Sequence, residues 1–149
     1  MIAGKTTSGK FGGVGRMVIK AFEIPEQDRP LWMSFLLGNI KVTPQGCWEW
    51  QGRIHRHKQY EHRENYKGYP CGNAKGKSTR WMHRVAFALY HGPIEANRHI
   101  DHECQNTICV CPWHIQSLPP YENYQLIQIR KRAEARRRLE ENGQMSLFC

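Results

Sequence analysis

Residues 99–115 read HIDHECQNTICVCPWHI, a stretch that places three histidines and three cysteines within seventeen residues. Such a density of reactive side chains is typical of disulfides in a small secreted domain or of a metal site. The amino-terminal sequence MIAGKTTSGKFGGVGR is glycine-rich and basic, without the apolar segment of a signal peptide. We therefore expect a metal site in a cytoplasmic protein.

The length and composition predict one domain with short extensions. The chain has 149 residues, of which 40% are hydrophobic, and its mean hydropathy is −0.70. The core is therefore modest, and the longest apolar stretch, near residues 31–37, is too short to span a membrane. We expect a flexible basic arm over 1–20, a domain over 21–142 and a tail over 143–149.

A basic surplus indicates a polyanionic partner. Lysine and arginine number 22 against 13 acids, for a net charge of +9, which favours nucleic acid over an anionic membrane. Residues 51–84 hold nine basic residues, with tyrosines and glycines between them, and only two acids. This pattern favours an antiparallel ribbon that contacts DNA, although a flexible basic loop is the alternative. The predicted DNA-binding residues are Arg53, Arg56, Lys58, Arg63, Lys67, Lys75, Lys77, Arg80 and Arg84.

Apolar periodicity and breaker residues predict an α+β fold. Ser78 or Thr79 is the expected cap of a central helix that Gly92 ends. The expected elements are a helix within 25–40, a strand within 46–52, a helix within 78–92, strands over 98–102 and 114–118, and a helix over about 121–142.

The spacing of Cys104, Cys109 and His114 is C-x4-C-x4-H. Structural zinc takes four sulfur or nitrogen ligands, so a fourth must come from elsewhere. Cys47, which precedes the aromatic strand, is our preferred fourth ligand. Cys111 is the alternative, although its closeness to Cys109 would cramp the chelate.

His102 lies two residues before the first of these loop cysteines and is left for chemistry. A neutral histidine can act as a general base that activates water. Phosphodiester cleavage also uses a divalent cation, and magnesium prefers oxygen ligands. Asn123 offers an amide oxygen and Asp101 a carboxylate. A zinc-stabilised loop that performs no catalysis is the alternative.

Several stretches together resemble a known family. GCWEWQG, GYP, HRVAFALYHGPI, HIDHECQNTICVCPWHI and YEN follow one another in the order and near the spacing of the HNH endonucleases. Within that family the chain resembles the His-Cys box homing endonucleases, which have a zinc-stabilised ββα-metal active site. The resemblance covers about residues 35–125.

The resemblance implies a DNA endonuclease that nicks or cuts both strands. His102 would be the general base, and Asn123 would hold the catalytic magnesium, with Asp101 as a possible second ligand. The implied structural zinc ligands are Cys47, Cys104, Cys109 and His114. Arg80, His83 and Arg84 are candidates for contact with the scissile phosphate. A non-catalytic zinc module that binds DNA is the alternative function.

The chain departs from the family at one position of the signature. Where the family has C-x-N-P, residues 109–112 read CVCP, so Cys111 replaces an asparagine that braces the loop. Because a thiol is a weak hydrogen-bonding group, we expect a looser loop or altered zinc ligation.

The tail QMSLF, residues 144–148, resembles the pentapeptide by which bacterial proteins dock on the sliding clamp. Gln144, Leu147 and Phe148 would make the contacts. The alternative is that Leu147 and Phe148 pack back on the domain. The clamp interpretation implies a bacterial cell, or a virus or mobile element within one.

Overall fold

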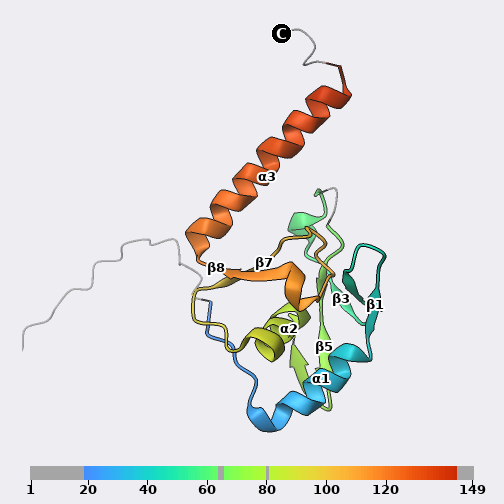
Figure 1. Ribbon diagram of the computed structural model, residues 1–149, viewed down its shortest axis with the longest axis vertical. Helices are drawn as coiled ribbons and strands as arrows, with labels where there is room; N and C mark the ends of the chain where they lie inside the picture. Colours follow the sequence, from blue (N-terminus) through green and yellow to red (C-terminus); the bar gives the residue numbers. More distant parts are fainter. Residues whose placement is uncertain (1–18, 64–65, 80, 144–149) are drawn as a thin grey trace, which may run out of the picture.

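The computed structural model describes residues 19–63, 66–79 and 81–143 (Figure 1). These ranges form a mixed fold of helices and small antiparallel sheets, as the sequence predicts. The helices are η1 (Glu26–Asp28), α1 (Arg29–Leu37), η2 (Lys58–Tyr60), α2 (Met82–His91), η3 (Pro112–His114) and α3 (Pro120–Glu141). The strands are β1 (Ile40–Val42), β2 (Trp48–Trp50), β3 (Ile54–His55), β4 (Tyr69–Pro70), β5 (Gly72–Ala74), β6 (Lys77–Thr79), β7 (His99–His102) and β8 (Ile115–Leu118).

The core lies around α2. Its residues Met82, Val85 and Leu89 recur at helical spacing and are buried, and Leu36 of α1 and Trp50 of β2 belong to the same cluster. Burial of each such side chain stabilises the fold by roughly 1.5–3 kcal/mol. The expected helix α1 and aromatic strand β2 are confirmed, and Cys47 directly precedes β2.

The start of α2 differs from the prediction. The helix begins at Met82, whereas Ser78 and Thr79 belong to β6, which pairs with β5. The predicted cap is wrong because strand pairing takes these residues, and the Thr79 hydroxyl accepts a bond from the Trp81 amide outside the helix. The end of the helix is as predicted, since Gly92 follows it with φ at +97°.

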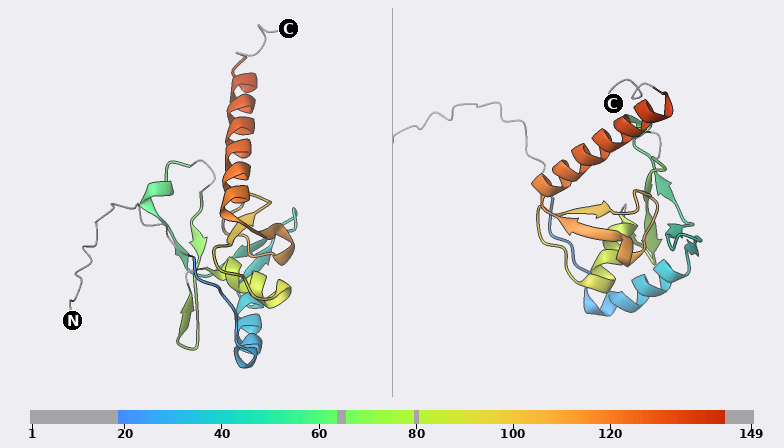
Figure 2. Two further views of the ribbon diagram at one scale, coloured as in Figure 1. Left: turned by 90° about the vertical axis from the view of Figure 1, so that its left-hand side faces the viewer. Right: turned by 45° about the horizontal axis from the view of Figure 1, so that its top comes forward.

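The basic segment forms two short antiparallel pairs, β3–β4 and β5–β6, rather than one continuous sheet. Only Cys71 separates β4 from β5, so the pairs follow one another as a ribbon beside the core (Figure 2). Gly68 permits the close approach of β4 to β3, because a Cβ there would lie 2.5 Å from Cγ2 of Ile54. The views place η2 at the end of the ribbon nearer α3 and the β5–β6 turn at the opposite end (Figure 2).

The chain ends in a ββα unit, with β7 antiparallel to β8 and followed by α3. Both strands and the helix are close to their predicted positions. No side chain of α3 is buried, and the helix extends well beyond the rest of the domain (Figure 1). Its outer half has ion pairs four residues apart, each worth about 0.3–0.5 kcal/mol to a helix. These pairs are Arg136–Glu140, Arg137–Glu141 and Arg138–Glu134.

None of the helices in the described ranges combines the length and the apolar character that a membrane crossing requires. Residues 1–18 of the basic arm predicted over 1–20, Arg80 and the tail residues Gln144, Leu147 and Phe148 lie outside those ranges.

Candidate metal centre and catalytic cleft

The structure brings together the four residues expected to bind zinc. The ligand atoms of Cys47, Cys104, Cys109 and His114 all lie within 4.8 Å of one another. Nδ1 of His114 is 3.5 Å from the Cys47 sulfur and 3.7 Å from the Cys109 sulfur. Ligand atoms at about 2.3 Å from a tetrahedral zinc lie about 3.8 Å apart, so the cluster has the dimensions of a zinc site. The donor set is compatible with a metal ion such as zinc.

Backbone pairing explains why Cys47 reaches a loop that follows it by more than fifty residues. The Trp50 amide donates to the Ile108 carbonyl at 3.0 Å, and the Val110 amide donates to the Trp48 carbonyl at 2.9 Å. These bonds align β2 with residues 108–110 and place Cys47 beside Cys109. The cluster of three cysteines and His114 therefore joins the β1–β2 hairpin to the ββα unit.

Cys111, the alternative ligand, is buried but lies outside the four-residue cluster. Its backbone amide donates to the Cys109 sulfur at 3.4 Å, and its carbonyl accepts from the His114 amide at 3.0 Å. Backbone groups thus brace the loop at the position where the family pattern has an asparagine. The thiol is not needed for that bracing.

The thiols of the cluster differ in acidity. Hydrogen bonding from Cys109 lowers the pKa of the Cys104 thiol to about 5. Burial and the nearby Cys104 charge raise the pKa of Cys47. Cys104 therefore ionises first, and binding of a metal would release protons from the remaining thiols.

His102 ends β7 and is only 7% exposed. The Cys109 carbonyl can only accept, so Nε2 of His102 donates to it at 3.0 Å and Nδ1 is the basic nitrogen. Burial lowers the pKa of His102, which keeps the ring neutral at physiological pH. His102 therefore has the protonation state that a general base requires.

His83 supports the other side of the His102 ring. The two ring centres are 5.1 Å apart, and His83 is buried. Its Nδ1 is buried without a hydrogen-bond partner among the described residues. His83 is therefore buried directly behind His102, and it is not among the residues that line the cleft.

His102 opens onto a cleft of about 520 Å³ between β7, α3 and the ribbon. Asn123, in the first turn of α3, lines the same cleft, so the expected base and the expected magnesium ligand share one space. The cleft is also lined by His62, Arg63, Tyr66, Tyr69, Asp101, Arg130 and Lys131.

Asp101 also lines the cleft, but both of its carboxylate oxygens are engaged. Arg130 donates to them at 2.6 and 2.9 Å, and the Gln116 side chain donates to Oδ2 at 3.1 Å. Burial favours a higher pKa for this carboxyl, yet these hydrogen bonds outweigh it and lower the pKa. Asp101 is thus an ionised partner of Arg130, a pairing that the sequence analysis did not find.

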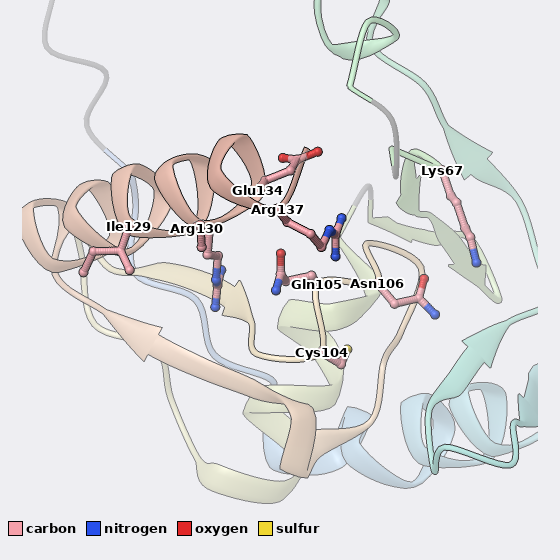
Figure 3. Close-up of a pocket in the computed structure, with 9 residues that line it drawn as sticks. Lys67, Cys104, Gln105, Asn106, Ile129, Arg130, Glu134 and Arg137 are labelled. Atoms are coloured by element: carbon pink, nitrogen blue, oxygen red, sulfur yellow. The ribbon is translucent and has the colours of Figure 1, made fainter. Parts of the chain in front are cut away.

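A neighbouring pocket of about 600 Å³ lies between α3 and the loop that carries Cys104 (Figure 3). Arg130 and Arg137 reach from α3 toward Gln105 and Asn106 of this loop (Figure 3). The sequence analysis did not identify Gln105 or Asn106 as part of a site. Asn106 donates to Glu49, and Lys67 forms an ion pair with the same carboxylate at 3.2 Å.

The basic residues of the 51–84 segment have different surroundings. The exposed side chains are Arg53, Arg56, Lys58, Arg63, Lys67, Lys75 and Lys77. Lys77 forms an ion pair with Asp28. The guanidinium of Arg84 donates to the carbonyls of Lys20 and Arg98 and is thus engaged within the domain.

Comparison with known proteins agrees with this geometry. Residues 80–125 match the family model described as HNH endonuclease. Protein 2.8 of Escherichia phage T7 is 36% identical over 91 residues, which cover 59% of this chain and 53% of that protein. The chain thus spans about half the length of this curated relative. No solved structure matches the chain significantly. The matched segment 80–125 contains His102, the loop cysteines, His114 and Asn123.

Proposed function

We propose that this protein is a magnesium-dependent endonuclease that hydrolyses phosphodiester bonds in duplex DNA. The observation that supports it best is the shared cleft of a neutral, buried His102 and Asn123, beside a cluster with the dimensions of a zinc site. Zinc would fix the loop and β7, and His102 would take a proton from the attacking water.

Asn123 would hold the magnesium ion through its amide oxygen. Magnesium usually keeps several waters and takes few protein ligands, so one amide oxygen together with phosphate oxygens is a sufficient donor set. When bound, the ion would neutralise charge that develops on the scissile phosphate and the leaving oxygen. Asp101 would be the second ligand, because its Oδ1 accepts only one bond, from Arg130, and keeps a lone pair for the ion.

A randomised library of DNA duplexes, incubated with the protein and MgCl₂, tests the activity and the target together. New ends that recur at one sequence would indicate a homing-type enzyme, whereas scattered ends would indicate a nuclease of low specificity. Paired ends on the two strands would distinguish a double-strand cut from a nick. Binding without any new ends would favour the alternative, a non-catalytic zinc module.

DNA would contact the end of the ribbon that lies near the cleft. Lys58 in η2 is exposed, and Arg63 lines the cleft with its guanidinium 4.4 Å from the Tyr60 ring centre. Lys75 lies in the β5–β6 turn, at the opposite end of the ribbon (Figure 2). The chain thus offers basic residues near to and far from the cleft for comparison.

A double variant with Lys58→Gln and Arg63→Gln should bind DNA more weakly than the wild type. Its affinity should also depend less on salt concentration. Each lost phosphate contact is expected to reduce the slope of log affinity against log salt concentration by about one. Lys75→Gln should change the slope much less. Equal slopes for all three proteins, measured by fluorescence anisotropy with one duplex, would contradict this placement.

We also propose that Gln144, Leu147 and Phe148 bind a bacterial sliding clamp. The support is the QMSLF sequence, together with the similarity to a phage protein, which fits a bacterial host. A short linear segment binds weakly alone, but simultaneous contact of the domain with DNA would raise its effective concentration.

A peptide of residues 142–149 should bind a bacterial clamp, and the same peptide with Leu147→Ala and Phe148→Ala should not. Surface plasmon resonance of both peptides on an immobilised clamp measures the difference. If neither peptide binds, or both bind equally, the clamp proposal fails and the nuclease proposal is unaffected.

A further inference from the structure

The residues expected to contact the scissile phosphate do not face the cleft. His83 is buried behind His102, and the guanidinium of Arg84 is engaged with backbone carbonyls, so neither lines the cleft. Arg80 lies outside the described ranges. Hydrolysis of a phosphodiester builds negative charge on the phosphate oxygens, and a fixed hydrogen-bond donor aimed at them stabilises the transition state. A donor on the ribbon side of the cleft, close to His102, would supply this contact.

Tyr69 lies at this place. It belongs to β4, pairs with His55 of β3 and lines the same cleft as His102. The centre of the His83 ring is 5.8 Å from that of Tyr69 and 5.1 Å from that of His102. Tyr69 and His102 thus contact the same buried ring, which places the phenol of the ribbon near the proposed base.

The Tyr69 ring is held by its neighbours. Besides His83, it contacts Tyr66 at 5.7 Å and Trp81 at 5.6 Å between ring centres, with interplanar angles of 66° and 70°. Such edge-to-face contacts between aromatic rings are favourable and restrict the orientation of each ring. Binding of a substrate therefore needs little further ordering of this side chain.

The hydroxyl groups of Tyr66 and Tyr69 differ in their partners. The Tyr66 hydroxyl accepts a bond from the His57 amide at 2.9 Å, whereas no described residue forms a hydrogen bond with the Tyr69 hydroxyl. Burial, with a smaller contribution from Tyr66, raises the pKa of Tyr69, so its phenol keeps the proton. A protonated phenol has one hydrogen bond to donate.

We infer that Tyr69 is a catalytic residue whose hydroxyl donates a hydrogen bond to a non-bridging oxygen of the scissile phosphate. The inference rests on the proposed nuclease function. The phosphate has two non-bridging oxygens, and the magnesium held by Asn123 and Asp101 would take one of them. Tyr69 would bind the other from the ribbon side, and this bond would strengthen as negative charge develops on the oxygen.

Tyr69→Phe removes the hydroxyl and keeps the packed ring. The probe is a duplex that carries the sequence cut most often in the randomised library. Its single-turnover cleavage with saturating MgCl₂ should be slower by about 10–100-fold, the expected loss for one hydrogen bond to a charged group. Zinc content, melting temperature and affinity for the duplex without magnesium should stay close to wild-type values.

Tyr60→Phe is the matched control. It removes the hydroxyl of a tyrosine that contacts Tyr66 in the same aromatic row but does not line the cleft. This variant should cleave the duplex at the wild-type rate.

Sulfur substitution in the DNA shows whether the hydroxyl contacts the phosphate. Replacing one non-bridging oxygen of the scissile phosphate with sulfur gives two diastereomers. Sulfur accepts hydrogen bonds poorly, and magnesium prefers oxygen. The wild type should therefore cleave both diastereomers more slowly than the unmodified duplex. In Tyr69→Phe, one of the two diastereomers should no longer be slowed relative to the unmodified duplex, because the hydrogen bond that its sulfur disrupts is already absent.

Each possible result separates the inference from the nuclease proposal. Equal rates for the wild type and Tyr69→Phe would overturn the inference and leave the nuclease proposal standing. A slower Tyr69→Phe that keeps both sulfur effects would also overturn it, because Tyr69 would then act without contacting the phosphate. Each sulfur effect is a ratio of two rates for one protein, so partial unfolding of a variant does not change it. Failure of the wild type to cut any duplex of the library would contradict the nuclease proposal and, with it, the role of Tyr69.

Discussion

Replacing Cys109 with serine is expected to abolish metal binding and unfold most of the protein. Structural zinc commonly contributes roughly 10–16 kcal/mol to folding, which exceeds or matches the ~5–15 kcal/mol total stability of an ordinary domain. Folding should depend strongly on metal binding in this protein, because the cluster joins β2 to the loop between β7 and β8. Metal analysis and circular dichroism at 25 °C measure the two effects.

Cys111→Ala is the matched control for this change. Cys111 lies in the same loop and packs in the buried cluster with Cys47 and Cys109, but its hydrogen bonds within the loop are made by backbone groups that the substitution keeps. This variant should keep about one zinc per chain and melt near the wild-type temperature. A normal zinc content in Cys109→Ser or in Cys47→Ala, or its loss in Cys111→Ala, would contradict the ligand assignment.

His102→Ala is expected to lower the rate of DNA cleavage by about 10²–10⁴-fold, the usual contribution of a general base. The substitution removes the basic Nδ1 and leaves the zinc ligands and the basic ribbon in place. Zinc content and DNA affinity should therefore remain close to wild-type values. Single-turnover cleavage with saturating magnesium measures the rate of the chemical step.

Two outcomes would count against His102 as the base. A variant that cleaves at the wild-type rate would show that another group activates the water. A loss of DNA binding or zinc equal to the loss of cleavage would show that the substitution damages the fold. The second outcome needs checking because His102 packs on His83 and leaves a cavity when truncated.

The metal site could be predicted from sequence because most of it is local. Cys104, Cys109 and His114 lie within eleven residues, and their spacing suits a single loop around one ion. Cys47 is distant in the sequence, but the aromatic strand that follows it must pack on the core. Its assignment as the fourth member of the cluster agrees with the geometry.

The ion pair between Asp101 and Arg130 could not be predicted in the same way. The two residues are 29 positions apart, and Arg130 is one of several basic residues on α3. Nothing in their spacing selects this pair, because it depends on the angle at which α3 leaves β8. The prediction that Asp101 is a magnesium ligand rests instead on chemistry, since a carboxylate beside His102 is a suitable oxygen donor.

The start of α2 shows how tertiary structure overrides a local signal. Ser78 and Thr79 are good helix caps by residue type, yet the β5–β6 pairing places them in a strand. Arg84 shows that a charge pattern alone does not identify DNA contacts. Its guanidinium donates to backbone carbonyls of the domain instead of lying on an open basic surface. Composition predicts the number of charges, whereas packing decides which of them face a partner.

Incubation of supercoiled plasmid DNA with zinc-loaded protein tests the nuclease assignment most directly. With MgCl₂, the protein should convert the plasmid to nicked or linear forms, and without a divalent cation the plasmid should remain supercoiled. If folded, zinc-loaded protein leaves the plasmid supercoiled at every magnesium and protein concentration, the assignment as a magnesium-dependent DNA endonuclease is contradicted.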